Sequence, residues 1–138
     1  MRSSVGTRSR GRLRVLVVDD DPLVRRLLHA VIQDGKYDLL EASDGIEALQ
    51  LAGKDPPDAV ILDVMMPGVN GYEVCRALRA DPRARDARIV ILTARDTDQD
   101  RAQAEAAGAD AFFTKPFSPL ELLEAIAPAA HGKRTLAR

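Results

Sequence analysis

Two short runs of the sequence, residues 15–18 (VLVV) and 59–62 (AVIL), are apolar at every position. A strand with one exposed face alternates apolar and polar residues, whereas a strand covered on both faces is apolar throughout. Such runs are also far too short to cross a membrane, so we expect no membrane insertion. The two runs therefore predict central strands of a parallel sheet with helices packed on both faces.

Strand-like and helix-like segments alternate along the rest of the chain. The expected strands are residues 13–18, 37–41, 58–62, 88–92 and 110–114. The expected helices are residues 23–34, 45–53, 71–80, 98–107 and 119–127. Alternation of this kind produces right-handed crossovers between parallel strands. We therefore predict an α/β protein whose five βα units form a doubly wound, five-stranded parallel sheet.

A chain of 138 residues with 46% apolar and 30% charged residues has the size and composition of one globular domain. Its single cysteine excludes a disulfide framework and favours a cytoplasmic location. Both ends are basic, because the first 14 residues hold five arginines and no acid. We expect a flexible basic arm at 1–12, the folded domain at 13–129 and a basic tail at 130–138. No aromatic residue accompanies the arm, so we expect no direct nucleic acid binding by this domain.

Polar side chains follow four of the five expected strands at the point where each strand ends. They are Asp19 and Asp20 after the first strand, Asp63 after the third, Thr93 after the fourth and Lys115 after the fifth. The carboxyl ends of parallel strands meet at one edge of the sheet, where sites of such folds lie. No glycine-rich loop follows the first strand, which excludes dinucleotide-binding and P-loop sites. The expected site therefore combines carboxylates, one hydroxyl and one ammonium group.

The carboxylates of this site need a counter-charge. Two carboxylates about 4 Å apart repel by about 4 kcal/mol at an effective dielectric constant near 20, and Lys115 supplies only one positive charge. Oxygen ligands with room for water suit Mg²⁺. The residues alone leave an alternative open, in which the acidic run 19–21 only caps the helix that follows it. We expect a magnesium site, since Asp63 and Lys115 are predicted to lie in the same cleft.

Four segments resemble, in order and spacing, the receiver domain of two-component response regulators. They are VLVVDDDP, ILDVMMPGVNGYEV, ILTA and FFTKPF. The resemblance covers about residues 13–127 and implies a flavodoxin-like fold with strand order 2-1-3-4-5. It further implies a domain that takes a phosphoryl group from a sensor histidine kinase or a histidine phosphotransfer protein. The last helix–strand–helix face of such a domain then changes and acts on a downstream target or output domain.

The resemblance also implies roles for individual residues. Asp63 corresponds to the phosphoacceptor. Asp19, Asp20, Asp63 and the backbone carbonyl of Met65 correspond to the ligands of Mg²⁺, and Mn²⁺ can take its place. Lys115 corresponds to the lysine that pairs with the phosphoryl group.

Further positions of the resemblance concern switching and access. Thr93 corresponds to the residue that hydrogen-bonds the phosphoryl group, and Phe112 to the aromatic residue that moves when this threonine moves. Pro116 corresponds to the proline of a cis peptide bond. Ala94 and Arg95 occupy positions that control access to the phosphoacceptor and the rate of autodephosphorylation.

Two rival functions have different expected features. A magnesium-dependent phosphohydrolase with an aspartate nucleophile carries Asp-x-Asp-x-Thr after its first strand, but here Leu23 stands at the threonine position. A phosphorylation-independent interaction module lacks some of the acidic, threonine or lysine positions, and none is missing here. We expect no enzyme beyond self-catalysed phosphotransfer and autodephosphorylation. The residues after 129 are too few for a second domain, so we expect a single-domain regulator or a receiver from a longer protein.

Overall fold

The structure is a computed structural model that describes residues 12–32 and 37–127. Most of the expected basic arm, the last two residues of the first expected helix and the basic tail lie outside the described residues. Within the two described ranges, no helix is long and apolar enough to cross a lipid bilayer.

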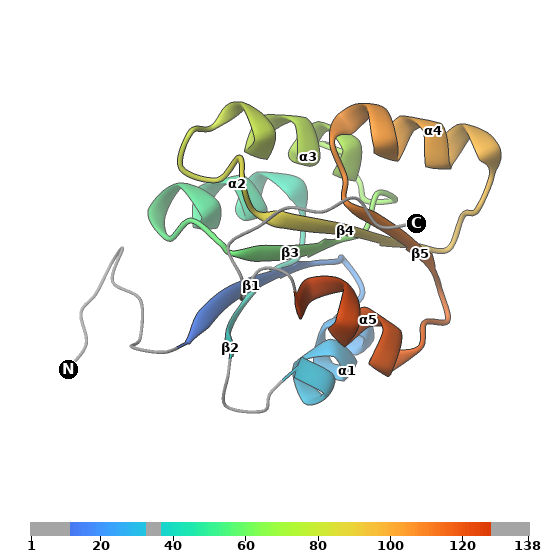
Figure 1. Cartoon of the computed structure of the whole chain (residues 1–138), viewed down its shortest axis with the longest axis horizontal. Coiled ribbons are helices and arrows are strands. Elements are labelled where there is room, and N and C mark those ends of the chain that lie inside the picture. Colours follow the sequence, from blue (N-terminus) through green and yellow to red (C-terminus); the bar gives the residue numbers. More distant parts are fainter. Residues whose placement is uncertain (1–11, 33–36, 128–138) are drawn as a thin grey trace.

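Five strands and five helices alternate along the chain (Figure 1). The strands are β1 (Leu13–Val18), β2 (Tyr37–Ala42), β3 (Ala59–Leu62), β4 (Arg88–Thr93) and β5 (Ala111–Thr114). The helices are α1 (Pro22–Ile32), α2 (Gly45–Lys54), α3 (Gly71–Ala80), α4 (Asp98–Ala107) and α5 (Pro119–Ile126). All strand pairs are parallel, and the strand order is β2-β1-β3-β4-β5. The predicted fold class and strand order are therefore confirmed.

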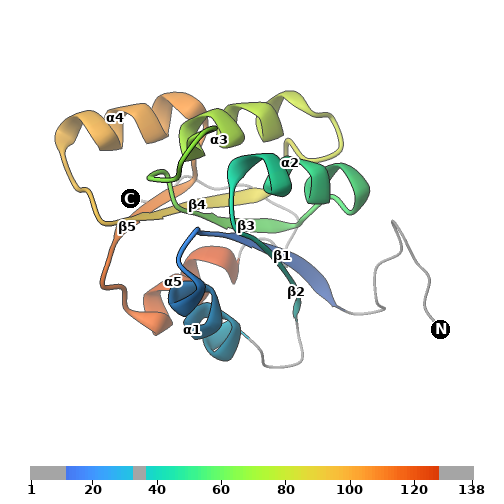
Figure 2. The ribbon, with the colours of Figure 1, turned by 180° about the vertical axis from the view of Figure 1, so that it is seen from behind.

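The sheet lies between two layers of helices, with α1 and α5 on one face and α2, α3 and α4 on the other (Figures 1 and 2). Consecutive residues of β1 point to opposite faces. Leu16 and Val18 belong to the core under α2–α4, whereas Val15 and Val17 belong to the core under α1 and α5. Full burial of each such side chain contributes about 1.5–3 kcal/mol to stability. The unbroken apolar run of β1 thus follows from its position between two cores.

Two local features fix the start of α3, which packs closely against the residues that follow β3. Asn70 caps the helix in a capping box, in which its side chain accepts from the Glu73 N–H and the Glu73 side chain accepts from the Asn70 N–H. Gly71 allows a close approach, because a Cβ there would lie 2.5 Å from the carbonyl oxygen of Asp63. Any larger residue at Gly71 would push α3 away from the strand end that carries Asp63.

Two expected strands begin one residue later than predicted, at Ala59 and Ala111 instead of Asp58 and Asp110. The side chains of both aspartates accept backbone N–H groups of neighbouring strands. Asp58 Oδ2 accepts from the N–H of Arg14 (2.8 Å), and Asp110 Oδ2 accepts from the N–H of Ile89 (2.9 Å). These two aspartates thus extend the hydrogen bonding of the sheet with side chains where its ladder begins.

Candidate functional site

Three carboxylates meet at the carboxyl edge of the sheet. Asp19 follows β1 and Asp63 follows β3, and the backbone N–H of Asp63 donates to the carbonyl of Val18 (2.9 Å). One carboxylate oxygen from each of Asp19, Asp20 and Asp63 lies within 4.8 Å of the others. Asp19 and Asp63 are only 2% and 5% exposed, whereas Asp20 is open to solvent. We call Asp19, Asp20 and Asp63 the acidic cluster.

Lys115 bridges two members of the acidic cluster. Its Nζ donates to Asp19 Oδ2 (2.8 Å) and to Asp63 Oδ2 (3.1 Å). The lysine follows β5, and its backbone N–H donates to the carbonyl of Thr93 (2.8 Å), which ties it to the end of β4. The peptide bond between Lys115 and Pro116 is cis, the geometry expected at this proline. Residues far apart in the sequence are thereby brought to one point, as the strand ends predicted.

The electrostatics of the cluster show a surplus of negative charge. Burial raises the pKa of Asp19, and the charge of Asp63 adds to this, while hydrogen bonds from Lys115 and from the Asp21 N–H oppose it. Burial lowers the pKa of Lys115, but its hydrogen bonds to Asp19 and Asp63 and their charges outweigh burial, so that the pKa is raised. Lys115 is therefore held protonated, and one ammonium group faces three carboxylates.

The acidic cluster fits a hard divalent cation. Asp63 Oδ1 accepts from the Met65 N–H (3.0 Å), and Asp19 Oδ1 accepts from the Asp21 N–H (2.9 Å). A carboxylate oxygen has two lone pairs, so these oxygens keep capacity for a further partner. An all-oxygen donor set with one side open to water is what Mg²⁺ prefers. The residues present thus fit the cation that the charge argument predicted.

The remaining expected residues lie around the cluster. Thr93 ends β4 and is fully buried, and its Oγ1 accepts from the backbone N–H of Arg95 (3.4 Å). Ala94 and Arg95 are exposed in the loop between β4 and α4. Phe112 lies in β5, half-buried against the core under α2–α4. The guanidinium of Arg101 lies over its ring, 4.6 Å from the centroid.

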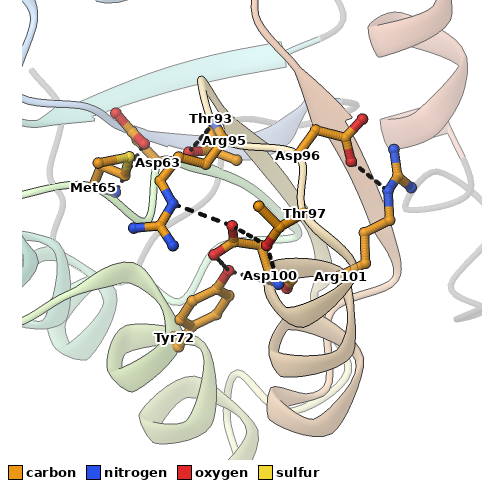
Figure 3. A network of polar contacts seen from close by, with 9 residues as sticks. All are labelled: Asp63, Met65, Tyr72, Thr93, Arg95, Asp96, Thr97, Asp100 and Arg101. Atoms are coloured by element: carbon orange, nitrogen blue, oxygen red, sulfur yellow. Dashed lines mark hydrogen bonds and ion pairs between the residues drawn. The ribbon is translucent and has the colours of Figure 1, made fainter.

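A second polar network, which the residues at the strand ends do not predict, joins the same loop to α3 and α4 (Figure 3). Its centre is Asp100, a residue that is 4% exposed in the first turn of α4. Asp100 Oδ2 accepts from Thr97 Oγ1 (2.7 Å) and Arg95 Nε (3.2 Å), and Asp100 Oδ1 accepts from the hydroxyl of Tyr72 (3.2 Å). The pattern Thr-x-x-Asp at 97–100 is a signal of helix capping in the sequence, and Thr97 does cap α4. The contact with Tyr72 has no such local signal.

Comparison with known families identifies the chain. The sequence model of the response regulator receiver domain matches residues 15–127. With the fold and the acidic cluster described above, the match means that this chain belongs to the response regulator receiver domain family. It is thus a regulatory domain of a two-component system.

Individual relatives agree with this assignment. The response regulator MprA of Mycobacterium leprae (strain TN) is 46% identical over 114 residues, which cover 83% of this chain and 49% of the relative. The chain thus spans about half the length of the curated relatives it matches. Among solved structures, the chemotaxis response regulator CheY4 of Vibrio cholerae matches with a TM-score of 0.78 and 33% identity, covering 86% of this chain and 98% of the other. The BeF3-activated DrrB receiver domain matches with a TM-score of 0.77 and 28% identity, covering 87% and 98%.

Proposed function

We propose that Asp63 accepts a phosphoryl group in a magnesium-dependent reaction, and that this event changes the face built by α4, β5 and α5. The observation that carries the proposal is the acidic cluster with Lys115 bridging Asp19 and Asp63 at 2.8 and 3.1 Å. A buried carboxylate beside a fixed ammonium group is suited to phosphoryl transfer, in which catalysis rests on positioning and on charge neutralisation. The fold, the family and this charge arrangement all favour the same function.

In the proposed reaction, one carboxylate oxygen of Asp63 forms a bond to the phosphorus atom of a phosphohistidine. The bond between that phosphorus and the imidazole nitrogen breaks, and its electron pair stays on the nitrogen. The N–H of Met65 holds one oxygen of Asp63 in place, and Lys115 offers its protons to the charge that develops on the phosphoryl oxygens. Asp19, Asp20, Asp63 and the backbone carbonyl of Met65 would hold Mg²⁺ or Mn²⁺, which when bound supplies the remaining positive charge.

Thr93 and Phe112 are the residues we assign to switching. Thr93 Oγ1 accepts a long hydrogen bond from the Arg95 N–H (3.4 Å), and this bond does not use the hydroxyl proton, which Thr93 can donate to a phosphoryl oxygen. Phosphorylation adds a charge of about −1.5 to −2 and strong acceptor oxygens. Movement of Thr93 toward that group would let Phe112 fill the space behind it. In this proposal the exposed Ala94 leaves the approach to Asp63 open, and Arg95 tunes the lifetime of the phosphorylated state.

The family suggests the partners. We infer that a sensor histidine kinase or a histidine phosphotransfer protein supplies the phosphoryl group, and that a downstream target or output domain reads the change. We further propose that the chain works in the cytoplasm and catalyses no reaction beyond its own phosphorylation and dephosphorylation. Neither rival function gains support, because Leu23 stays at the position of the hydrolase threonine and all receiver positions are filled.

The proposal is tested by incubating the chain with acetyl phosphate and magnesium and measuring the intact mass. We expect the wild-type chain to gain one phosphoryl group, and the gain to disappear when magnesium is removed with a chelator. The Asp63→Asn variant should gain nothing, while Asp58→Asn, which changes an aspartate at the opposite edge of the sheet, should behave as wild type. Equal labelling of wild type and Asp63→Asn would show that another residue is the acceptor.

A further inference from the structure

The buried Asp100 forms an ion pair with Arg95, which lies two residues after Thr93. The side chain of Arg95 is 54% exposed and pairs through Nε with Asp100 Oδ2 at 3.2 Å. In the view of Figure 3, Arg95 lies between Asp63 and Asp100, with its Nε turned toward Asp100. The backbone N–H of Arg95 donates to Thr93 Oγ1, so the backbone of Arg95 lies next to the phosphoacceptor site.

Asp100 is an ionised carboxylate that does not depend on Arg95 alone. The hydrogen bond from the Thr97 hydroxyl lowers the pKa of Asp100, and the Tyr72 hydroxyl and the charge of Arg95 lower it further against the effect of burial. Thr97 is the N-cap of α4, and Tyr72 is buried in α3. If Arg95 leaves, Asp100 still has these two donors, so the buried charge is not stranded.

A phosphoryl group on Asp63 would compete for the same guanidinium. It carries more negative charge than one carboxylate, and arginine binds phosphate oxygens through two parallel hydrogen bonds. Arg95 is largely exposed, so its side chain can turn without unpacking a core. The fraction of time that Arg95 spends near Asp63 is then set by how strongly Asp100 retains it.

We propose that Asp100 is a positioning residue that withholds Arg95 from the phosphoacceptor, and that Arg95 moves to the phosphoryl oxygens once Asp63 is phosphorylated. This inference rests on the proposed function of Asp63 and adds a regulation to it. The exchange stabilises the phosphorylated state while loosening the contact between the β4–α4 loop and α4.

A second ion pair, between Asp96 in the same loop and Arg101 in α4, provides a matched control. Asp96 Oδ1 accepts from Arg101 Nε (2.6 Å), and both side chains are about half exposed. Arg101 lies over the ring of Phe112. The Asp96→Asn variant thus removes one negative charge from the same region but releases Arg101 and leaves the pair of Arg95 and Asp100 in place.

The test is a double-mutant cycle on the affinity for beryllofluoride, a phosphoryl mimic, in the presence of magnesium. We expect Asp100→Asn to tighten binding about fivefold, the size of one partly exposed ion pair. Arg95→Ala should remove this gain, so that Arg95→Ala with Asp100→Asn binds no tighter than Arg95→Ala alone. Asp96→Asn should change the affinity by less than about twofold. An equal gain in the Arg95→Ala background, or an equal gain from Asp96→Asn, would overturn the assignment of Asp100.

A measurement on the wild-type chain covers the case in which Asp100→Asn fails to fold. The side-chain N–H resonance of Arg95 should shift when beryllofluoride saturates the chain, and that of Arg79, at the opposite edge of the sheet, should not. An unchanged Arg95 resonance would contradict the exchange. Wild-type chain that fails to bind beryllofluoride, or an Asp63→Asn variant that binds it equally well, overturns the proposed function and the inference with it. If the wild-type chain binds beryllofluoride and Asp100→Asn does not change the affinity, the inference alone is overturned.

Discussion

Charged side chains are buried at both edges of the sheet, but the two edges balance charge in different ways. At the amino edge, Asp110 is 2% exposed, and its Oδ2 accepts from Arg79 Nη2 (2.8 Å) and from the N–H of Ile89 (2.9 Å). Arg88 is also buried there and donates from Nε to the carbonyl of Ala125 (2.6 Å). Burial lowers the pKa of Arg88, and the charge of Asp110 opposes this. Opposite charges and backbone groups thus match one another at the amino edge.

At the carboxyl edge, the two buried carboxylates Asp19 and Asp63 share one ammonium group, that of Lys115, and the exposed carboxylate of Asp20 lies beside them. Removing a carboxylate from water is unfavourable unless a partner compensates for it, so the surplus charge destabilises the chain in the absence of a cation. Buried charge by itself therefore does not mark a functional site. The imbalance between buried charges does, because the missing partner has to come from outside the chain.

The largest effect is expected from breaking the balance at the amino edge. Asp110→Ala removes a carboxylate that accepts from the largely buried Arg79 and from the Ile89 N–H. We expect the free energy of unfolding to fall by about 3–5 kcal/mol. Urea unfolding with and without magnesium measures it, and the loss should be the same in both conditions. A loss that magnesium restores would mean that the two edges are not independent.

The next largest effect concerns the surplus at the carboxyl edge. At about 100-fold excess over its dissociation constant, magnesium should stabilise the wild-type chain by about 2.7 kcal/mol, because it binds the folded chain. The variant Asp20→Ala should lose most of this stabilisation. Without magnesium it should be no less stable than wild type, since Asp20 is exposed and one repelling charge is gone. Thermal unfolding of both chains measures this, and a metal-free Asp20→Ala chain that is clearly less stable would contradict the surplus.

Tyr72 lies beside Asp100, a buried carboxylate that does have partners within the chain. Burial raises the pKa of Tyr72 to about 12, and the charge of Asp100 and its hydrogen bond contribute. A group whose pKa is raised by folding contributes stability below its unfolded pKa, and that contribution is lost as the pH rises through the folded value. In a Tyr37→Phe background, Tyr72 is the one tyrosine left, and its ultraviolet absorbance should show that it ionises with a pKa of about 12.

The same background gives the corresponding stability measurement. The free energy of unfolding should decline between about pH 10 and 12 relative to the chain in which Tyr72→Phe is added. Adding Asp100→Asn to Tyr37→Phe should lower the pKa of Tyr72 partway toward its ordinary value. A Tyr72 pKa near 10 in the chain that retains Asp100 would show that this network does not raise the pKa of Tyr72.

The smallest effect on stability, and a specific effect on switching, is expected from Thr93→Ala. The hydrogen bond that Thr93 Oγ1 accepts is long, so we expect its loss to cost about 1 kcal/mol or less. The variant should still accept a phosphoryl group at Asp63. Backbone amide shifts of α4, β5 and α5 on adding beryllofluoride should be much smaller than in wild type. Shifts of wild-type size would show that another group couples Asp63 to this face.

The fold could be predicted because its main determinants are local or depend on the face of a strand. The apolar runs of β1 and β3 require cover on both sides, and alternation with helices leaves few topologies. The ends of elements were less predictable. Asp58 and Asp110 stand just before their strands, and their side chains accept N–H groups of neighbouring backbone, a contact that requires the assembled sheet.

The acidic cluster could be predicted for the same reason as the fold, since residues at the carboxyl ends of parallel strands meet. The network around Asp100 could not. Tyr72 and Asp100 lie on different helices, and their contact depends on how closely α3 and α4 pack. Only the cap by Thr97 is a local feature of the sequence. Contacts between helices of one layer thus remain the part of this site that needs a structure.

The central claim is that the surplus of negative charge, and with it the cation site, belongs to the carboxyl edge alone. A magnesium titration of the isotope-labelled chain, followed by backbone amide shifts, tests it most directly. We predict saturable shifts at residues 19–21 and 63–65, and none at Asp58 or Asp110. The Asp63→Asn variant should show the same localisation with weaker binding. Shifts spread evenly over both edges, or centred on the amino edge, would contradict the account.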